Sequence, residues 1–569
     1  MPQPGRVAQV YTARRPYVWA LGLVLALALV FDLWGRQWGL YNSWHADELG
    51  EQTAGLFRQH TVNPHYFMYG NIAFYRTALA VGPAIAYTTV FDPAPAASDV
   101  SARADWVDRY QRRIAAWPRV LSLIEAVFLV VATCLIGATL CDRWTGLLGG
   151  AALVLAPTSV YIAHVSTVDG FANLMMWLAT LAALRGWKRR SDGAFMFATF
   201  LAGVAGGIKL DHFLVVVPVA VAYAWRGAPR WRDVGLLLLV PAGYLFANPI
   251  LVIRPFEFVD GLTRDMWFGA MADVGSRSSY GVLFDYLRNG MGWPLLALSL
   301  FGFGYAALRV ARGLQRRELL WLVSTFLPYC VIFGSKRVYP HYIGQLLPGL
   351  SLIGAYGAMQ AIADAPRAWR PWSAGALAAF YALALLGPIS LDLQFTHDPR
   401  DAAGRWITEH IPASSTIFVS ERGPKLSSVR YRLEPMLPDR ERWTSYTTSP
   451  RQRMDEDGLY RRVRRSILAG ERWAGRTLGT PVREQPYQGW YDDVFRDLDT
   501  RPNARERLKA ERPDYVVIVE NMSPTVLTWL RTPGSGYAEI AAFAYRSPVR
   551  SNLEMPMLNQ KVWIFRRIS

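Results

Sequence analysis

The sequence predicts a mostly α-helical polytopic membrane protein, a helical bundle followed by a small soluble α/β domain. Two observations carry this prediction. Only 18% of the 569 residues are charged and 52% are hydrophobic, whereas soluble domains are about one quarter charged. The apolar residues also form runs up to about residue 391, and the rest of the chain is rich in charge, Pro and Tyr. We therefore expect a transmembrane domain over residues 1–392 and a soluble domain over residues 393–569.

About eleven of these runs approach the roughly 20 residues that a membrane-spanning helix needs. The first is not followed by a small-residue cleavage site, so we expect it to remain as a helix rather than to be removed as a signal peptide. The expected helices lie near 17–34, 114–140, 146–163, 169–184, 194–208, 212–225, 234–253, 291–308, 319–334, 342–359 and 374–391.

Basic residues in alternate loops predict the orientation. They cluster at Arg143, 185–190, 226–232, 309–317 and 367–370. Cytoplasmic loops carry an excess of Lys and Arg, so we expect a cytoplasmic N-terminus and an extracytoplasmic C-terminal domain. One more apolar run, 71–91, would invert every later loop if it crossed the membrane. We expect it to be an interfacial helix within an outer loop that spans residues 36–113.

The net charge of +17 comes without any nucleic-acid-binding motif, so we expect no nucleic-acid partner. We expect membrane lipid to be the partner that surrounds the helices instead. The three cysteines all fall in or beside apolar runs. This position excludes a disulfide framework in the C-terminal domain and a cysteine metal cluster.

The first outer loop carries two adjacent carboxylates, Asp47 and Glu48, directly after the first helix. A second segment, 63–69, contains His65 and three aromatic residues that include Tyr69. Carboxylates followed by aromatic residues at a membrane surface suit a polar substrate held beside the bilayer. The alternative is a solvated turn without catalytic function.

Two short connections between expected helices on the outer side also carry charged residues. Asp169 opens the fourth expected helix, where it either binds substrate or only caps the helix N-terminus. Lys209 lies within an apolar segment, at a cost of about 2.5–3.5 kcal/mol on insertion scales. Such residues mark functional sites or paired partners, and the alternative is that Lys209 and Asp211 neutralise each other.

The fourth group is Lys336, Arg337, Tyr339 and His341, on the side where positive loops are not expected. An anionic partner such as a phosphate explains this cluster, although attraction to lipid phosphates is the alternative. Taken together, the groups predict transfer from a lipid-anchored phosphate donor. A carboxylate would take the proton of an acceptor hydroxyl, and cations would stabilise the departing phosphate.

The order of these features resembles the GT-C glycosyltransferases of the protein O-mannosyltransferase and aminoarabinose-transferase type, glycosyltransferase family 39 and its bacterial relatives. The matching features are the pair Asp47-Glu48, the N-P-H-x-F-x-Y line at 63–69, the surface helix 71–91, Asp169, Lys209 and the Y-x-x-x-x-x-P segment from Tyr342 to Pro348. The resemblance covers about residues 10 to 392. Many relatives carry an aromatic residue or Pro where this chain has Ala46, a difference that leaves both carboxylates in place.

The resemblance implies a polyprenyl-phosphate sugar donor and transfer, with inversion, to a hydroxyl of a lipid, glycan or protein acceptor. The transfer would occur at the outer face of a bacterial inner membrane. By the same resemblance, Asp47 is the base, Glu48 positions it or the acceptor, and Asp169 is a supporting acid. The residues expected to bind substrate are Lys209, Arg337, Tyr339, His341, His65 and Tyr69.

Three alternatives stay open. Basic side chains could replace a divalent ion, so no metal is required, yet His45, Asp47 and His65 together could form a divalent-metal site. A transporter or flippase of a lipid-linked anion would also need a lysine in an apolar setting, but transporters have internal repeats and mid-membrane sites, which the sequence does not indicate. A non-catalytic assembly subunit at the outer face would not need the carboxylates.

The C-terminal domain is expected to begin with a helix over 400–410. Strands are expected at 416–420, 515–520 and 562–566. An aromatic run at 487–491 suits stacking against sugars, or else ordinary core packing.

Overall fold

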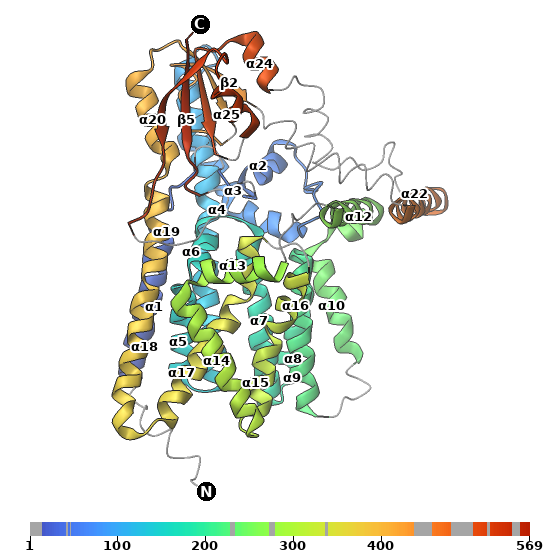
Figure 1. Cartoon of the computed structure of the whole chain (residues 1–569). Helices are drawn as coiled ribbons and strands as arrows, with labels where there is room; N and C mark the ends of the chain where they lie inside the picture. Colours follow the sequence, from blue (N-terminus) through green and yellow to red (C-terminus); the bar gives the residue numbers. More distant parts are fainter. Residues whose placement is uncertain are drawn as a thin grey trace.

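A computed structural model of the chain describes residues 14–40, 44–45, 47–227, 234–271, 279–335, 339–420, 422–436, 458–478, 504–520, 524–548 and 558–568. It consists of a bundle of long helices with a small α/β domain at one end (Figure 1). The predicted fold class, a helical membrane bundle with a C-terminal α/β domain, is confirmed.

Each of the eleven apolar runs is helical. The bundle helices are α1 (Arg14–Leu33), α4 (Val100–Leu140), α5 (Arg143–Val154), α6 (Pro157–His164), α7 (Val168–Arg189), α8 (Asp192–Ile208), α9 (Val216–Arg226), α10 (Val234–Ala247), α14 (Trp293–Ala311), α15 (Arg316–Ser324), α16 (Leu327–Ser335), α17 (Leu347–Asp364), α18 (Arg370–Ala384) and α19 (Leu386–Thr396). In the described part of the chain, five helical segments are long and apolar enough to cross a membrane, or six if the bent pair α5–α6 counts as one span.

The bundle is held together by large buried aromatic residues and by close backbone contacts. Trp177, Trp321 and Tyr329 are fully buried between its helices. Helices α8 and α10 approach so closely that a Cβ atom on Gly203 would lie 2.0 Å from the carbonyl oxygen of Val240. Only glycine fits such a contact, so this pair depends on the absence of a side chain.

The two ends of the bundle differ in character. Helix α1 begins at one end, which we call the basic end, and the C-terminal domain lies at the other, the domain end (Figure 1). Ion pairs link helices at the basic end, including Lys188 to Glu318 at 2.6 Å and Arg309 to Asp364 at 2.9 Å. The arginine-rich loops at 185–190, 309–317 and 367–370 therefore lie at the same end of the bundle.

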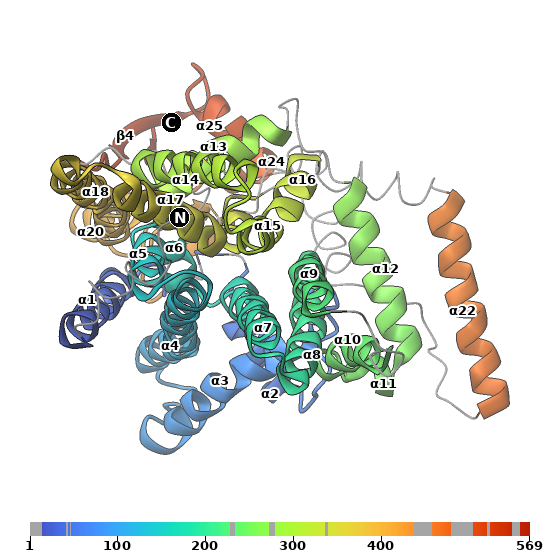
Figure 2. The same cartoon turned by 90° about the horizontal axis from the view of Figure 1, so that it is seen from below.

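Several helices lie across the bundle axis at the domain end (Figures 1 and 2). They are α2 (Gly50–Arg58), α3 (Asn71–Phe91), α12 (Pro255–Met271) and α13 (Ser279–Met291). Short turns there are α11 (Ile250–Ile253), η2 (Leu210–Val215) and η4 (Pro340–Gln345), whereas η5 (Arg367–Trp369) joins α17 to α18 at the basic end. Helix α3 covers the whole run expected to be interfacial. It buries Phe74 and Val81 and exposes Leu79, Val90 and Phe91.

The C-terminal domain is a five-stranded mixed sheet with strand order β2-β1-β3-β5-β4. Its elements are α20 (Pro399–His410), β1 (Thr416–Ser420), β2 (Arg432–Met436), α22 (Gly458–Leu478), α24 (Ala504–Glu511), β3 (Tyr515–Val519), α25 (Pro524–Leu530), β4 (Tyr537–Phe543) and β5 (Val562–Arg567). Alternate residues of β3 pack against α20 on one face and against α24 and α25 on the other. The aromatic run 487–491 lies outside the described residues.

Helix α19 continues through the boundary expected at residue 392, and the chain then turns at a buried ion pair that fixes the domain to the first loop. Asp398 accepts a hydrogen bond of 2.8 Å from the indole of Trp38. Arg400 pairs with Asp398 at 2.7 Å, and its guanidinium lies 3.7 Å from the ring centre of Trp44. Both charged side chains are fully buried.

We predict that Arg400→Gln will destabilise the contact between the domain and the bundle by about 3–5 kcal/mol, because it leaves Asp398 as a buried charge without its partner. The measurement is thermal unfolding and limited proteolysis of the purified chain near residue 397. The exposed Arg405 of the same helix is the matched control, as Arg405→Gln. Equal behaviour of the two variants would contradict this prediction.

Candidate active site at the domain end

The Glu48 carboxylate joins three segments of the domain end. It receives two hydrogen bonds from Arg119 of α4, at 2.7 and 3.0 Å, and one of 3.0 Å from the backbone N–H of Ser166. Burial would raise the pKa of Glu48, but the Arg119 charge and hydrogen bond outweigh it and lower that pKa. Glu48 is therefore a charged anchor that fixes the position of its neighbour Asp47.

A second buried ion pair lies beside the first. Arg76 of α3 donates to Glu125 of α4 at 2.7 and 2.5 Å. Arg76 also donates to the Ser166 hydroxyl at 3.3 Å. The tip between α6 and α7 thus contacts both ion pairs, and the pairs hold α3, α4 and the first loop together.

Asp47 differs from these paired carboxylates. It is partly exposed, and among the described residues no hydrogen bond or ion pair to its carboxylate is present; its backbone N–H donates to His45 Nδ1 at 3.2 Å. Tyr69 and His341 both lie within its electrostatic reach. A carboxylate without a protein partner is available to accept a proton from a substrate.

Lys209 and Asp169 form the third buried pair, at 2.6 Å. The Lys209 ammonium also lies 4.0 Å from the ring centre of Tyr342, and His341 Nε2 is 4.0 Å from the other Asp169 oxygen. The cap of α7 is Thr167, whose hydroxyl accepts from the Asp169 N–H at 3.4 Å. Asp169 is therefore a charge partner in the first turn of α7, and the alternative interpretation of Asp169 as the helix cap was wrong.

Asp211 was the alternative counter-charge of Lys209; the two charges do interact, but among the described residues the ion pair of Lys209 is with Asp169. The Asp211 carboxylate accepts from Gln345 at 2.6 Å and contacts His212 Nδ1 at 2.8 Å. These contacts join η2 to η4, so Asp211 holds together the two turns on either side of the Lys209 pair.

Tyr69 reaches this region through a close backbone contact. The N–H of Gly70 donates to the carbonyl of Ile208 at 2.9 Å, and a Cβ on Gly70 would lie 2.3 Å from the Gly207 carbonyl oxygen. The pKa of the Tyr69 phenol is raised by burial and by the nearby charges of Asp47 and Asp169. Tyr69 is therefore a neutral hydrogen-bond donor beside both carboxylates.

His65 contacts a residue that is not among the predicted site residues. Its Nδ1 lies 2.8 Å from Glu257 of α12, and Asn63 donates to the same carboxylate oxygen at 2.9 Å. Burial would raise the pKa of Glu257, but these hydrogen bonds hold it at about 2. The candidate metal set His45, Asp47 and His65 is thus divided, and within the described ranges no three His, Cys, Asp or Glu side chains are grouped so as to hold a metal ion.

The fourth predicted group is only partly described, because Lys336 and Arg337 lie outside the described residues. Tyr339 and His341 stack with ring centres 5.7 Å apart. Burial lowers the pKa of His341 despite the neighbouring Asp169. The imidazole is therefore neutral at pH 7 and can donate a hydrogen bond without carrying a charge.

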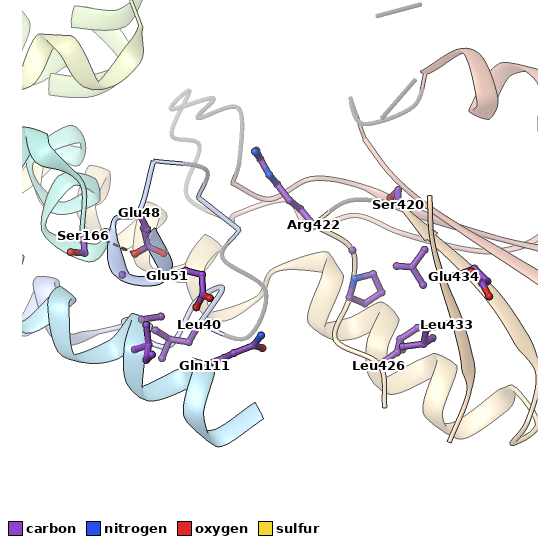
Figure 3. Close-up of a pocket in the computed structure, with 16 residues that line it drawn as sticks. Leu40, Glu48, Glu51, Gln111, Ser166, Ser420, Arg422, Leu426, Leu433 and Glu434 are labelled. Carbon is purple, nitrogen blue, oxygen red and sulfur yellow. Dashed lines mark hydrogen bonds between the residues drawn. The ribbon is translucent and has the colours of Figure 1, made fainter. Parts of the chain in front are cut away.

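A cavity of about 500 Å³ separates the first loop from the C-terminal domain. Glu48, Glu51 and Gln111 lie on one side, and Ser420 and Glu434 lie on the other (Figure 3). The side chain of Arg422 extends between the two walls in the same view. The cavity volume is in the range of small-molecule sites, and its lining offers both carboxylates and a cation.

The sequence interpretation missed the charged residues that hold the site together. Arg119 and Glu125 lie inside an apolar run, and Arg76 lies inside the expected interfacial helix. Charged residues within apolar runs are rare and usually paired, so this signal was available in the sequence. Glu257 lies in a long outer segment of mixed composition, and no sequence pattern distinguishes it.

Several solved structures resemble this chain. ArnT from Cupriavidus metallidurans bound to undecaprenyl phosphate shares 15% identity over 97% of this chain and 98% of that chain, with a TM-score of 0.49. The apo state of the same protein shares 13% identity over 95% of this chain and 97% of that chain, with a TM-score of 0.48. The apo oligosaccharyltransferase of Archaeoglobus fulgidus shares 12% identity over 72% of this chain and 63% of that chain, with a TM-score of 0.43. These are GT-C enzymes, the class that the sequence resembles.

No family model and no curated protein matches the chain. A likeness at these identities and TM-scores assigns no activity, so a proposal about function depends on the chain's own residues.

The paired role of Glu48 predicts a coupled loss of stability. Glu48→Gln and Arg119→Met should each lower the free energy of unfolding by about 3–5 kcal/mol, because each leaves one buried charge alone. The double variant should lose less than the sum of the two by at least about 1 kcal/mol. Thermal unfolding of the four proteins measures this coupling, and additive losses would contradict the ion pair.

The Glu257 contacts predict a pH dependence. Because the folded pKa of about 2 lies below the ordinary value of 4.5, the stabilisation is complete above pH 4.5 and is lost as the pH falls toward 2. Protection of the amides of residues 61–70 against hydrogen exchange should fall about tenfold over this range. Glu257→Gln should remove most of the dependence, and an unchanged pH profile in this variant would contradict the assignment.

Proposed function

We propose that this chain is a membrane glycosyltransferase that moves a sugar from a polyprenyl-phosphate donor to a hydroxyl acceptor. The reaction occurs at the domain end, on the extracytoplasmic side of a bacterial inner membrane. The observation that carries the proposal is the convergence of Asp47, a carboxylate without a described partner, with the Lys209–Asp169 pair and His341 at one end of the bundle.

In the proposed reaction, Asp47 accepts the proton of the acceptor hydroxyl. The acceptor oxygen forms a bond to the anomeric carbon while the bond from that carbon to the phosphate oxygen breaks. The electron pair of the broken bond leaves with the polyprenyl phosphate. Attack on the face opposite the leaving group inverts the anomeric carbon, and the oxocarbenium-like transition state lets a modest base suffice.

Lys209 is the proposed phosphate partner. Its ammonium has three N–H donors, and one of them points to Asp169. Because Asp169 cancels the charge of Lys209, a phosphate needs a second cation. Arg337, which lies two residues before Tyr339 in the sequence, is the candidate.

The remaining candidates supply neutral contacts or hold others in place. Tyr69, Tyr339 and His341 are hydrogen-bond donors for the sugar or the phosphate. Glu48 positions Asp47 through Arg119, and His65 holds the segment that carries Tyr69 through Glu257. The cavity beside Glu48 is the proposed approach for the acceptor, because its carboxylates and amide can accept hydrogen bonds from hydroxyl groups.

Two other functions would require a different arrangement of these residues. A transporter of a lipid-linked anion would place its binding residues near the middle of the membrane, whereas Lys209 and Asp169 lie where α8 ends and α7 begins. A non-catalytic assembly subunit would not need an available carboxylate at position 47. Both observations favour the transferase.

We predict that Asp47→Asn will reduce sugar transfer from an undecaprenyl-phosphate donor by at least about 100-fold, the usual contribution of a general base. The fold should be unchanged, because the Asp47 carboxylate has no described partner to lose. Transfer is measured with purified protein in nanodiscs. The exposed Asp105 of α4 provides the matched control, as Asp105→Asn.

Transfer at the parental rate in Asp47→Asn would reject the assignment of the base. An absence of transfer in the parent chain, with polyprenyl-phosphate donors of several sugars, would favour the transporter or the assembly subunit.

A further inference from the structure

Helix α22 is a strongly basic amphipathic helix that lies beside the bundle. It runs lengthwise beside α12 when the molecule is seen along the bundle axis (Figure 2), and both helices lie across that axis in Figure 1. Arg464 of α22 pairs with the buried Asp260 of α12 at 3.1 Å. The rings of Tyr460 and Trp267 contact each other with centres 5.8 Å apart.

The inward face of α22 is defined by its periodicity. Tyr460, Glu471 and Ala474 are buried, and Arg464 is half-buried. Their spacing places them on one side of the helix, the side that faces α12. The single acidic residue of α22, Glu471, is therefore turned inward.

The outward face carries the positive charge. Five arginines are exposed on α22, namely Arg461, Arg462, Arg465, Arg472 and Arg476. The exposed face also carries Leu459 and Trp473, which are 53% and 57% exposed. A helix with arginines and a tryptophan on its exposed side is typical of helices that lie at a membrane interface.

The position of α22 relative to the bundle brings this face to the level of a bilayer surface. Helix α12 begins a few residues after α10, a helix of the bundle, has ended at Ala247. Helix α12 therefore lies close to the end of the bundle, and the Arg464–Asp260 pair keeps α22 at the same level. Exposed apolar residues on α12, Val259 and Met266, lie seven positions apart and so share one face.

We propose that α22, together with α12, docks on the outer leaflet of the membrane by binding the phosphate groups of anionic lipids. The guanidinium group matches phosphate oxygens with two donors in a fixed geometry, and basic residues near an anionic membrane surface are attracted to it. The partner is the lipid surface itself. This proposal concerns a surface apart from the Asp47 site and does not depend on the proposed activity.

Hydrogen exchange of the full chain in nanodiscs tests the docking. One nanodisc contains only phosphatidylcholine and the other contains about one-third phosphatidylglycerol, at the low ionic strength where surface charges act most strongly. The amides of residues 458–478 should exchange at least about tenfold more slowly with the anionic lipid, and about 1 M NaCl should remove the difference. Equal exchange in the two nanodiscs would overturn the proposal.

Two sets of variants identify the face that binds. Replacing Arg462, Arg465 and Arg476 by Gln should abolish the lipid-dependent protection, whereas replacing them by Lys should retain most of it. The charge-matched control replaces the exposed Arg405, Arg531 and Arg566 of the C-terminal domain by Gln, and it should leave the protection intact. Loss of protection in this control, or its persistence in the α22 Gln variant, would show that general charge rather than this face is responsible and would overturn the proposal.

Discussion

The domain end of this protein depends on the neutralisation of charges that are buried away from water. A buried charge without a partner costs several kcal/mol, so an opposite charge from another segment can hold two segments together. Three buried pairs join different segments in this way: Glu48–Arg119, Arg76–Glu125 and Asp169–Lys209. Helix α4 supplies the cation of one pair and the anion of the next. The pairs therefore fix the first loop, α3 and the tip before α7 relative to one another.

This arrangement separates structural carboxylates from an available one. Glu48, Glu125 and Asp169 all have a cation at hydrogen-bond distance, and their charges are used to hold the segments in place. Asp47 lies next to the most strongly held of them and has no such partner in the described residues. Proton transfer in a catalytic site requires a base that is available to the substrate and is held in place by rigid neighbouring residues. The structural pairs thus position the residue that we propose as the base.

Much of the fold could be predicted because apolar runs report burial directly. The eleven helical runs, helix α3 and the three inner strands β1, β3 and β5 all follow from such runs. The two strands that were not predicted, β2 and β4, are the edges of the sheet. Edge strands are half-exposed and tolerate Pro and charge, as Pro435 and Glu539 illustrate, so their sequences lack the apolar pattern.

The candidate site shows which contacts a sequence cannot supply. Asp169 lies beside both Lys209 and His341, and Asp47 is within electrostatic reach of His341, but the roles of these residues remain predictions. The partner of Lys209 could not be chosen, because Asp169 and Asp211 are both acidic and only the three-dimensional arrangement separates them. The N-P-H-x-F-x-Y line groups His65 with Tyr69, yet the partner of His65 is Glu257, 192 positions away on α12.

The most direct test is a structure of the chain in nanodiscs with undecaprenyl phosphate bound. We expect the phosphate within about 3 Å of the Lys209 ammonium, with open space between the phosphate and Asp47. A phosphate bound elsewhere, with Lys209 and Asp47 both distant from it, would contradict the proposed site.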